Sequence, residues 1–370
     1  MSTFFKKVLL LILPILILFG LPLMVEIMSG ELTPLATVIN EQINSNKEIL
    51  YGPAYSNRVI SYKSEMVRRI KPEVLALGNS KILTIRKEFF KTNTIFYNAG
   101  STAASIEAFK MFVESTGVYP KVIIMTVEPL HFNPSLKIDK AKVAEDLKYV
   151  SPFSEILNAV GKPWLGVYRD YIQKKFTLKA LFAKNSGEKI GLNALINNSG
   201  MRNDGSFHYG NQYVGDQSHI DKINDAVNFI THRQSAPSDE IISKEALSEL
   251  DTFLKFCKEH NIYVIGYTPP APHVIYEAYK EFPSYGYMFK TYEDTKPIFK
   301  KNNFSIFDFF DMATFGAPDF ESLDGYHTDE KTTLRIIIKM AESDKTLRNY
   351  VDPKYLQGVL NSAKDRNDII

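Results

Sequence analysis

The chain has 370 residues, of which 45% are hydrophobic and 23% are charged, a composition that excludes intrinsic disorder. Its 44 Lys and Arg residues against 42 Asp and Glu give a formal net charge of +2, so nucleic acid is not an expected partner. The single cysteine, Cys257, excludes an internal disulfide and a cysteine-based zinc site, and we expect it to be a buried apolar group. We expect no bound metal and no cofactor, because the histidines show no paired helical spacing.

An apolar run from Val8 to Val25 follows Lys6 and Lys7 at the start of the chain. A helix of this length measures roughly 27 Å, enough to cross a bilayer, and its prolines are tolerated in membranes. A cleaved signal peptide is the alternative, but no small-x-small cleavage site follows the run. Residues 1–30 therefore predict a cytoplasmic stub and an uncleaved transmembrane helix in the lipid bilayer, with the rest of the chain outside the cytoplasm.

The segments that follow divide by composition. Residues 31–70 are mixed polar and basic and predict a stalk and a leading helix at Ser61–Ile70. We expect the main domain at residues 71–345, with a long insertion at about 134–240, and a C-terminal tail at 346–370. An insertion of this length in a compact domain is either a lid or binding surface or a subdomain without a role in the site.

Five apolar runs in the main domain alternate with helical patterns. The runs cover residues 73–78, 94–100, 121–127, 261–268 and 304–309. The helical patterns between and after them cover residues 101–114, 243–260 and 328–341. Continuous apolar strands separated by helices indicate an α/β protein with a parallel sheet covered on both faces. Such a sheet binds its ligands at the carboxyl ends of its strands.

The insertion predicts two amphipathic helices, Ala141–Val160 and Leu165–Leu181, and then a polar loop at residues 197–209. Its aromatic residues have two interpretations: they stack on sugars or lie at the membrane interface, or they form the core side of a helix. Their helical spacing favours the core. These residues are Trp164, Tyr168, Tyr171 and Phe176.

Three short motifs follow strands of the predicted sheet. Ser80 comes directly after the first strand behind a glycine turn, where a serine is either an exposed nucleophile or a cap. Gly100 ends the second strand and can offer a backbone N–H to a ligand. Asp324 and His327 are three residues apart after the fifth strand, so the carboxylate can orient the imidazole as a base. Asp308 and Asp311 are rival acids. His273 has two interpretations, a residue that lines the site or, as the sequence favours, a histidine on a surface loop.

The three motifs together resemble the SGNH/GDSL hydrolase superfamily over residues 71–132 and 255–340. Leu77-Gly78-Asn79-Ser80 is similar to the Gly-Asp-Ser nucleophile motif, with Asn79 where Asp is usual. Asn98-Ala99-Gly100 is similar to the second block, and Asp324-Gly325-Tyr326-His327 to the Asp-x-x-His block. The resemblance implies a flavodoxin-like three-layer fold.

The same resemblance implies the role of each matching residue. Ser80 is the nucleophile, His327 the general base and Asp324 its orienting partner, while the N–H groups of Ser80 and Gly100 bind the oxyanion. Asn79 is placed against the substrate.

The third block of the family, Gly-x-Asn-Asp, is absent. After the third strand the chain reads Glu128-Pro129-Leu130-His131-Phe132-Asn133. Asn133 or His131 is a candidate replacement for the missing donor, and His131 is also a candidate for substrate binding. The loss of one oxyanion donor typically costs about 100- to 1000-fold in rate.

A membrane helix, a long insertion and a late Asp-x-x-His motif also resemble an envelope subgroup of this superfamily. It includes the D-alanylation protein of lipoteichoic-acid synthesis and the polysaccharide O-acetylation proteins. The resemblance implies transfer of an acetyl or similar small acyl group, through an acyl-serine, to an envelope polysaccharide or glycolipid. It also implies a membrane-bound O-acyltransferase as partner. Two alternatives remain: an anchored esterase or deacetylase with the same triad, and a non-catalytic assembly partner.

Overall fold

A computed structural model of the chain describes most of the sequence. The described residues are 2–56, 58–135, 140–147, 164–182, 187–210, 216–232, 242–367 and 369–370. They divide into two compact units. The N-terminal unit comprises residues 1–58, 149–203 and 207–212. The sheet unit comprises residues 59–148, 204–206 and 213–370. The predicted boundaries at 30 and 70 differ from this division, because much of the insertion folds with the N-terminal segment.

The sheet unit is built on a five-stranded parallel sheet with the order β3-β2-β4-β8-β9. Its strands are β2 (Val74–Gly78), β3 (Phe96–Gly100), β4 (Val122–Thr126), β8 (Tyr263–Thr268) and β9 (Ser305–Asp308). Each strand lies inside one of the five predicted runs, so the predicted α/β class and parallel sheet are confirmed. β2 to β4 are buried along their whole length, which explains why their sequences are continuously apolar.

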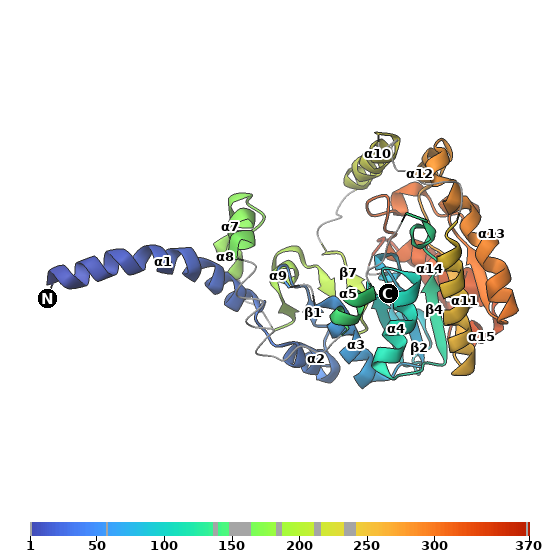
Figure 1. Cartoon of the computed structure of the whole chain (residues 1–370), viewed down its shortest axis with the longest axis horizontal. Helices are drawn as coiled ribbons and strands as arrows, with labels where there is room; N and C mark the ends of the chain where they lie inside the picture. Colours follow the sequence, from blue (N-terminus) through green and yellow to red (C-terminus); the bar gives the residue numbers. More distant parts are fainter. Residues whose placement is uncertain are drawn as a thin grey trace. The chain divides into compact units, whose positions relative to one another are not determined.

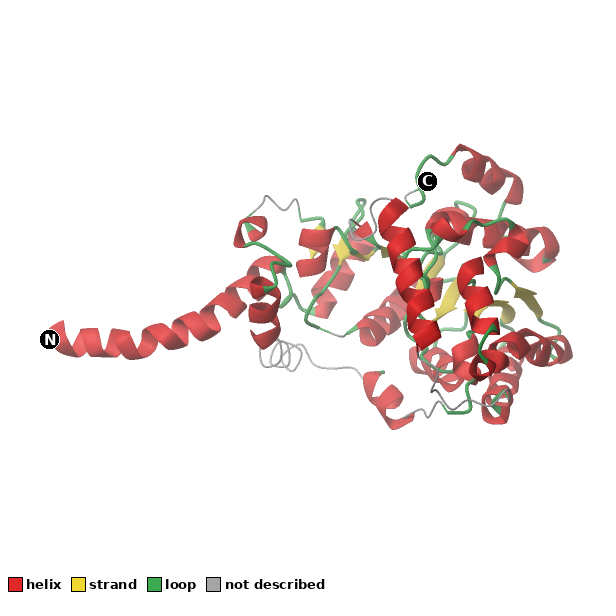
Figure 2. Ribbon diagram, turned by 90° about the horizontal axis from the view of Figure 1, so that it is seen from above, coloured by secondary structure: helices red, strands yellow, loops and turns green. Residues whose placement is uncertain are grey.

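Helices cover both faces of this sheet, as the yellow strands between red helices in Figure 2 show. Val74 and Ala76 of β2 point to one face and belong to the hydrophobic cluster formed with α14 (Glu330–Ser343) and α16 (Pro353–Ser362). On the other face, Gly266 of β8 lies against the ring of Phe299 on α13 (Gly286–Lys301). Helix α11 (Lys244–Glu259) packs beside α13 on one side and beside α4 (Ile106–Thr116) on the other (Figure 1).

The predicted C-terminal tail is wrong. Residues after 345 form α15 (Lys345–Arg348) and α16, and Leu347 and Leu356 are buried in the same cluster as the sheet. Burying one such leucine stabilises the fold by about 2 kcal/mol. The segment is therefore part of the core that supports the strands.

Helix starts in the sheet unit follow capping side chains. The helix predicted from residue 101 begins only at Ile106, because Ser105 caps it by accepting a hydrogen bond from Ala108 N. Ser101 adopts a φ of 67°, so residues 101–105 form a turn instead. Helix α14 begins after Asp329, whose carboxylate accepts a hydrogen bond from Thr332 N. The leading helix is observed as α3 (Val59–Ile70), close to its predicted range.

The sheet unit also contains three helices on its periphery. They are α5 (Lys140–Asp146), α10 (Asp216–His232) and α12 (His273–Lys280). Helix α5 covers the start of the predicted helix Ala141–Val160, and the remainder of that prediction lies largely outside the described residues. Ile223 of α10 packs with Ile275 of α12 in a second cluster.

The N-terminal unit holds a small four-stranded sheet with the order β5-β1-β6-β7. Its strands are β1 (Leu50–Tyr51), β5 (Lys189–Ile190), β6 (Gly200–Met201) and β7 (Phe207–His208). Its helices are α1 (Ser2–Ser29), α2 (Leu35–Asn44), α7 (Trp164–Ile172), α8 (Leu178–Leu181) and α9 (Leu192–Asn197). The predicted stalk and polar loop are therefore wrong in part, since both contribute strands to this sheet.

Helix α1 is bent. No single helix in the described part of the chain meets the length and hydropathy needed to cross a membrane; Phe4–Pro14 and Leu18–Ser29 meet them only as a pair, bent by 56°. Pro14 and Pro22 lie inside α1, and each lacks the backbone N–H that would bond the carbonyl four residues before it. The apolar run from Val8 to Val25, predicted as a transmembrane helix, therefore belongs to a helix that bends between Pro14 and Leu18.

Candidate active site

The site lies at the carboxyl end of the sheet, where the strand order reverses. Strand β2 has β3 on one side and β4 on the other, and the chain visits β3 before it crosses to β4. Such a reversal leaves a crevice between the ends of two neighbouring strands. Ser80 follows β2, and Glu128 follows β4. The predicted position of the site at the strand ends is confirmed for these two loops.

Ser80 is the first residue of a 3₁₀ turn, Ser80–Ile82, that starts immediately after β2. Asn79 caps the turn, because its Oδ1 accepts a hydrogen bond from Lys81 N at 3.0 Å. A Cβ at Gly78 would collide with Thr126 Oγ1, so only glycine allows the chain to pass β4 here. The Ser80 N–H has no acceptor among the described residues, and it therefore remains available to a ligand.

Asp324 and His327 lie on a closed loop between β9 and α14. Asp324 Oδ1 accepts hydrogen bonds from Tyr326 N at 2.9 Å and His327 N at 2.8 Å. Gly325 adopts a φ of +86°, which the tight turn requires. Ser322 Oγ accepts from Gly325 N and donates to His327 O, so the two ends of the loop are tied together. The loop thus fixes the carboxylate and the imidazole before any substrate is bound.

The structure brings the three predicted residues together in one hydrogen-bonded line. Ser80 Oγ lies 2.8 Å from His327 Nε2, and His327 Nδ1 lies 2.8 Å from Asp324 Oδ2. Burial alone would raise the pKa of the Asp324 carboxyl, but the hydrogen bond and charge of His327 hold it below its ordinary value. An ionised Asp324 keeps the proton on Nδ1, which leaves Nε2 free to accept the Ser80 proton.

The rival acids are engaged elsewhere. Asp308 accepts a hydrogen bond from Thr268 Oγ1 at 2.6 Å. Asp311 lies 3.1 Å from Nδ1 of His273 and caps the turn Met312–Phe315. Asp311 and His273 therefore form a second acid–histidine pair in the sheet unit, separate from the pair that contacts Ser80. Cys257 is buried, as predicted.

The geometry does not support the oxyanion role predicted for Gly100. Its N–H donates to Asn98 Oδ1 at 2.8 Å, and a Cβ at Gly100 would lie 2.7 Å from Ile82 Cγ2. The Asn98 amide is buried and donates to Ile82 O and Ile85 O, both at 2.8 Å. The second motif therefore holds the turn that follows Ser80, because the Asn98 side chain reaches back to the Gly100 N–H before any ligand can.

A pocket of about 440 Å³ opens beside the turn that carries Ser80. It is lined by Asn79, Ala104, Glu128, Leu130, His131, Asn133 and Ser135. Asn79, His131 and Asn133, all predicted as site residues, therefore line one pocket. The Asn133 amide contacts Tyr287 Oη at 3.4 Å, a long distance for a hydrogen bond, so its Nδ2 is only weakly engaged.

Glu128 and Lys81 form an ion pair behind the Ser80 turn, and the sequence analysis did not predict this pair. Glu128 Oε2 lies 3.0 Å from Lys81 Nζ, and it accepts a hydrogen bond from Asn79 Nδ2 at 3.0 Å. Burial would raise the pKa of Glu128, but the charge of Lys81 and the hydrogen bonds from Asn79 and Lys81 hold it below its ordinary value. The pair thereby ties the turn that carries Ser80 to the end of β4. Its only sequence signal is a charged residue directly after a buried strand.

His131 is a neutral imidazole in the wall of the pocket. Its side chain is buried, and Nδ1 has no hydrogen-bond partner among the described residues. Burial lowers the pKa of His131 to about 4, with Lys81 acting in the same direction and Glu128 opposing it. The neutral side chain lines the pocket, while its Nδ1 is enclosed by protein atoms.

The low pKa of His131 predicts a loss of stability in acid. Between about pH 6.5 and pH 4 the unfolded chain binds the proton and the folded chain does not, so the unfolding free energy falls as pH falls. The full effect is up to about 3 kcal/mol. We expect the His131→Gln variant of the full chain in detergent to lose less thermal stability than the wild type between pH 7.5 and pH 4.5. Equal losses in the two proteins would contradict this assignment.

No group of three or more His, Cys, Asp or Glu side chains in the described ranges is placed to hold a metal ion. No protein-family model matches the chain, and neither a curated protein nor a solved structure matches it.

Proposed function

We propose that the chain is a membrane-anchored SGNH-type acyltransferase that moves a small acyl group through Ser80 to a cell-envelope polysaccharide or glycolipid. The observation that carries the proposal is the line from Ser80 Oγ through His327 to Asp324, with two contacts of 2.8 Å. If the five strands of the large sheet are numbered along the chain, their order across the sheet is 2-1-3-4-5. This is the flavodoxin-like order that the proposed fold requires.

Acylation begins when His327 Nε2 takes the hydroxyl proton of Ser80. The Oγ then forms a bond to the carbonyl carbon of the acyl donor, and the tetrahedral oxyanion collapses as the bond to the leaving group breaks. His327 returns its proton to that leaving group, which gives the acyl-serine. In the second half-reaction an acceptor hydroxyl loses its proton to His327 and attacks the acyl carbon, and Ser80 recovers the proton.

The oxyanion requires donors that replace the one expected from Gly100. The Ser80 N–H is unengaged among the described residues, and the weakly held Asn133 Nδ2 lines the adjoining pocket. These two groups are the donors we assign. A site with only two donors is consistent with a lower rate than one with three, by about 100- to 1000-fold for a lost donor.

Polar side chains in the pocket favour a polyol acceptor. The imidazole of His131, the amide of Asn133 and the Asn79 side chain present donors and acceptors that match sugar hydroxyls. The apolar helix α1 supports a location at the membrane, with the sheet unit outside the cytoplasm. The proposed source of the acyl group is a membrane-bound O-acyltransferase, the partner that the resemblance implies.

The products of the reaction test the transferase. The full chain is incubated in detergent with a radiolabelled acetyl aryl ester and a hydroxyl-bearing envelope glycan, and the label is followed into glycan and into free acid. We expect label on the glycan, removable by mild base, only when Ser80 and His327 are present. Label found only as free acid would overturn transfer and favour the esterase, and no turnover at all would favour the non-catalytic partner.

A further inference from the structure

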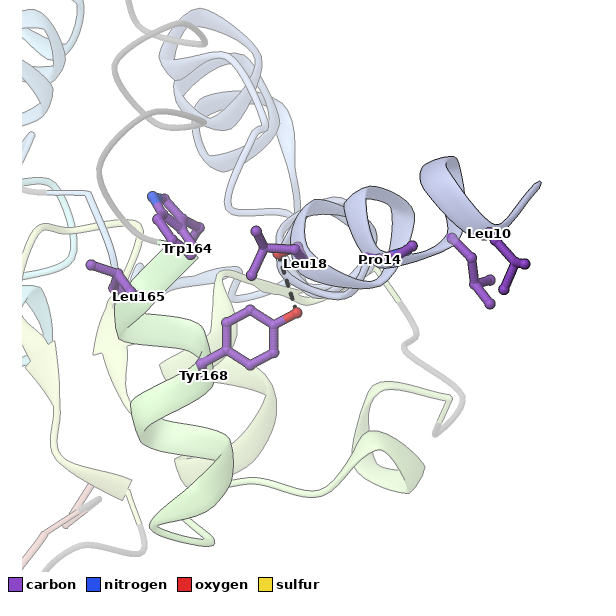
Figure 3. Close-up of a pocket in the computed structure, with 7 residues that line it drawn as sticks. Leu10, Pro14, Leu18, Trp164, Leu165 and Tyr168 are labelled. Atoms are coloured by element: carbon purple, nitrogen blue, oxygen red, sulfur yellow. Dashed lines mark hydrogen bonds between the residues drawn. The ribbon is translucent and has the colours of Figure 1, made fainter. Parts of the chain in front are cut away.

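An apolar groove of about 620 Å³ runs between α1 and α7 in the N-terminal unit (Figure 3). Its lining residues are Leu10, Leu13, Pro14, Leu18, Trp164, Leu165 and Tyr168. Figure 3 shows Trp164 and Tyr168 on α7 facing the side of α1 that carries Leu18. The groove is open along one side and is bordered almost entirely by carbon atoms, so it offers no built recognition for a polar ligand.

Tyr168 supplies a hydrogen bond that Pro22 removes from helix α1. The Leu18 carbonyl is four residues before Pro22, which has no N–H to donate to it. The Tyr168 hydroxyl donates to Leu18 O at 3.1 Å instead. A carbonyl left without a donor in hydrocarbon costs several kcal/mol, whereas in water a solvent molecule would bond it at little cost. The hydrogen bond from Tyr168 to Leu18 O therefore stabilises the structure most where water is absent.

The first turn of α7 is apolar, and its second half carries charged side chains together with Ile172, which is 75% exposed. At the first turn Leu165 is 62% exposed, and the Trp164 ring lies 5.6 Å from the ring of Phe19 on α1. Near the other end, Asp170 bonds Lys175 and Arg169. An apolar end with Trp and a charged end is the arrangement of a segment that crosses from hydrocarbon to headgroups.

The position along α1 sets the depth of this contact. Leu18 lies ten residues beyond Val8, where the apolar run starts. Ten residues of helix measure roughly 15 Å, and α1 bends between Pro14 and Leu18, so Leu18 lies at most half-way through the hydrocarbon layer. The outer surface of α1 is apolar on both sides of the groove, with Leu10 70% exposed and Phe19 51% exposed. Because the groove is continuous with that surface, the lipid acyl chains that cover the surface also fill the groove.

We infer that the start of α7 enters the hydrocarbon layer beside α1, and that lipid acyl chains fill the groove. This inference rests on the membrane location in the proposed function. It adds a second membrane-contacting element, contributed by the insertion, with Trp164 at the depth of the acyl chains. The insertion thus holds the N-terminal unit at the bilayer surface in addition to the bent helix.

Trp164 is the only tryptophan in the chain, so its fluorescence reports on this position alone. The full chain is reconstituted into phosphatidylcholine vesicles, with or without bromine atoms on the lipid acyl chains, and vesicle flotation measures how much protein is bound. We expect bound protein to emit at short wavelength and to lose about twofold or more of its Trp164 emission to the brominated lipid. A chain that floats and shows no quenching overturns the inference and leaves the membrane anchor standing.

A control tryptophan on the sheet unit calibrates the result. In a Trp164→Phe background, Tyr355→Trp places the probe at an exposed position of α16, where we expect no quenching by the same vesicles. A chain that does not float overturns both the anchor and the inference, while acyl transfer through Ser80 is measured separately in detergent. If Trp164 emits at short wavelength without quenching, and this emission shifts to longer wavelength when the protein is diluted, a second copy of the chain fills the groove. That result would overturn the inference that lipid fills it.

Discussion

Replacing Ser80 by alanine is expected to lower acyl transfer by about 10⁴-fold or more, because the nucleophile that carries the acyl group is removed. The loss is expected in kcat and to leave binding of the acceptor nearly unchanged, since the pocket beside the turn stays intact. The measurement is the rate of aryl ester cleavage and of label transfer by the full chain in detergent, wild type against variant.

Ser362→Ala is the matched control, since this serine is exposed on α16 and bonds only a carbonyl of its own helix. We expect it to retain the wild-type rate. The far-UV circular dichroism of both variants should equal that of the wild type, because Ser80 makes no contact that the core requires. A Ser80→Ala protein that folds and keeps more than a tenth of the activity would contradict the assigned nucleophile.

Asp324→Asn is expected to lower the rate by about 10⁴-fold while leaving the loop in place. The asparagine Oδ1 can still accept from Tyr326 N and His327 N, so the turn is retained. Its Nδ2 cannot accept from His327 Nδ1, so the imidazole takes the other tautomer and Nε2 no longer accepts the Ser80 proton. The measurement is kcat for aryl ester cleavage together with thermal stability.

The second acid–histidine pair of the sheet unit supplies the control for this variant. Asp311 and His273 lie 3.1 Å apart, yet neither contacts Ser80. Asp311→Asn removes the same kind of charge from the same kind of pair and is expected to change kcat by less than about threefold. Equal losses from Asp311→Asn and Asp324→Asn would show that the effect is general electrostatics or folding, and would remove the basis for the triad.

Local sequence signals were sufficient for the large sheet and for the meeting of three side chains. The five strands are continuous apolar runs because both faces of the sheet are covered, and such runs are visible without any knowledge of contacts. Ser80, Asp324 and His327 meet because parallel strands bring their following loops to one edge. The three-residue spacing of Asp324 and His327 was sufficient to predict that they share one turn. The structure agrees, because His327 Nδ1 contacts Asp324 Oδ2 within a loop that Ser322 closes.

The N-terminal unit could not be predicted in the same way. Its strands are two residues long, which is too short for an alternating pattern, and β1 pairs with β5 across more than a hundred residues of sequence. Glu31 shows why the predicted stalk is folded: its buried carboxylate accepts hydrogen bonds from Ala54 N and Leu192 N. Such long-range bonds leave no trace in local composition.

The errors within the site also come from side chains that reach across the sequence. Gly100 satisfied the family motif, but the side-chain Oδ1 of Asn98, two residues earlier, accepts its N–H. Glu128 and Lys81 had no signal as a pair, because they are brought together only when β2 and β4 align. The membrane prediction named the prolines of α1 without an angle, since hydropathy does not register the size of the bend between Pro14 and Leu18.

The most direct test of the account treats the full chain in detergent with a serine-directed fluorophosphonate and locates the adduct by mass spectrometry. We expect a single modified serine, Ser80, with labelling lost in Ser80→Ala and strongly slowed in His327→Ala, because only the imidazole at 2.8 Å activates that hydroxyl. An unlabelled Ser80 under conditions that label a control serine hydrolase, or labelling that does not depend on His327, would contradict the triad.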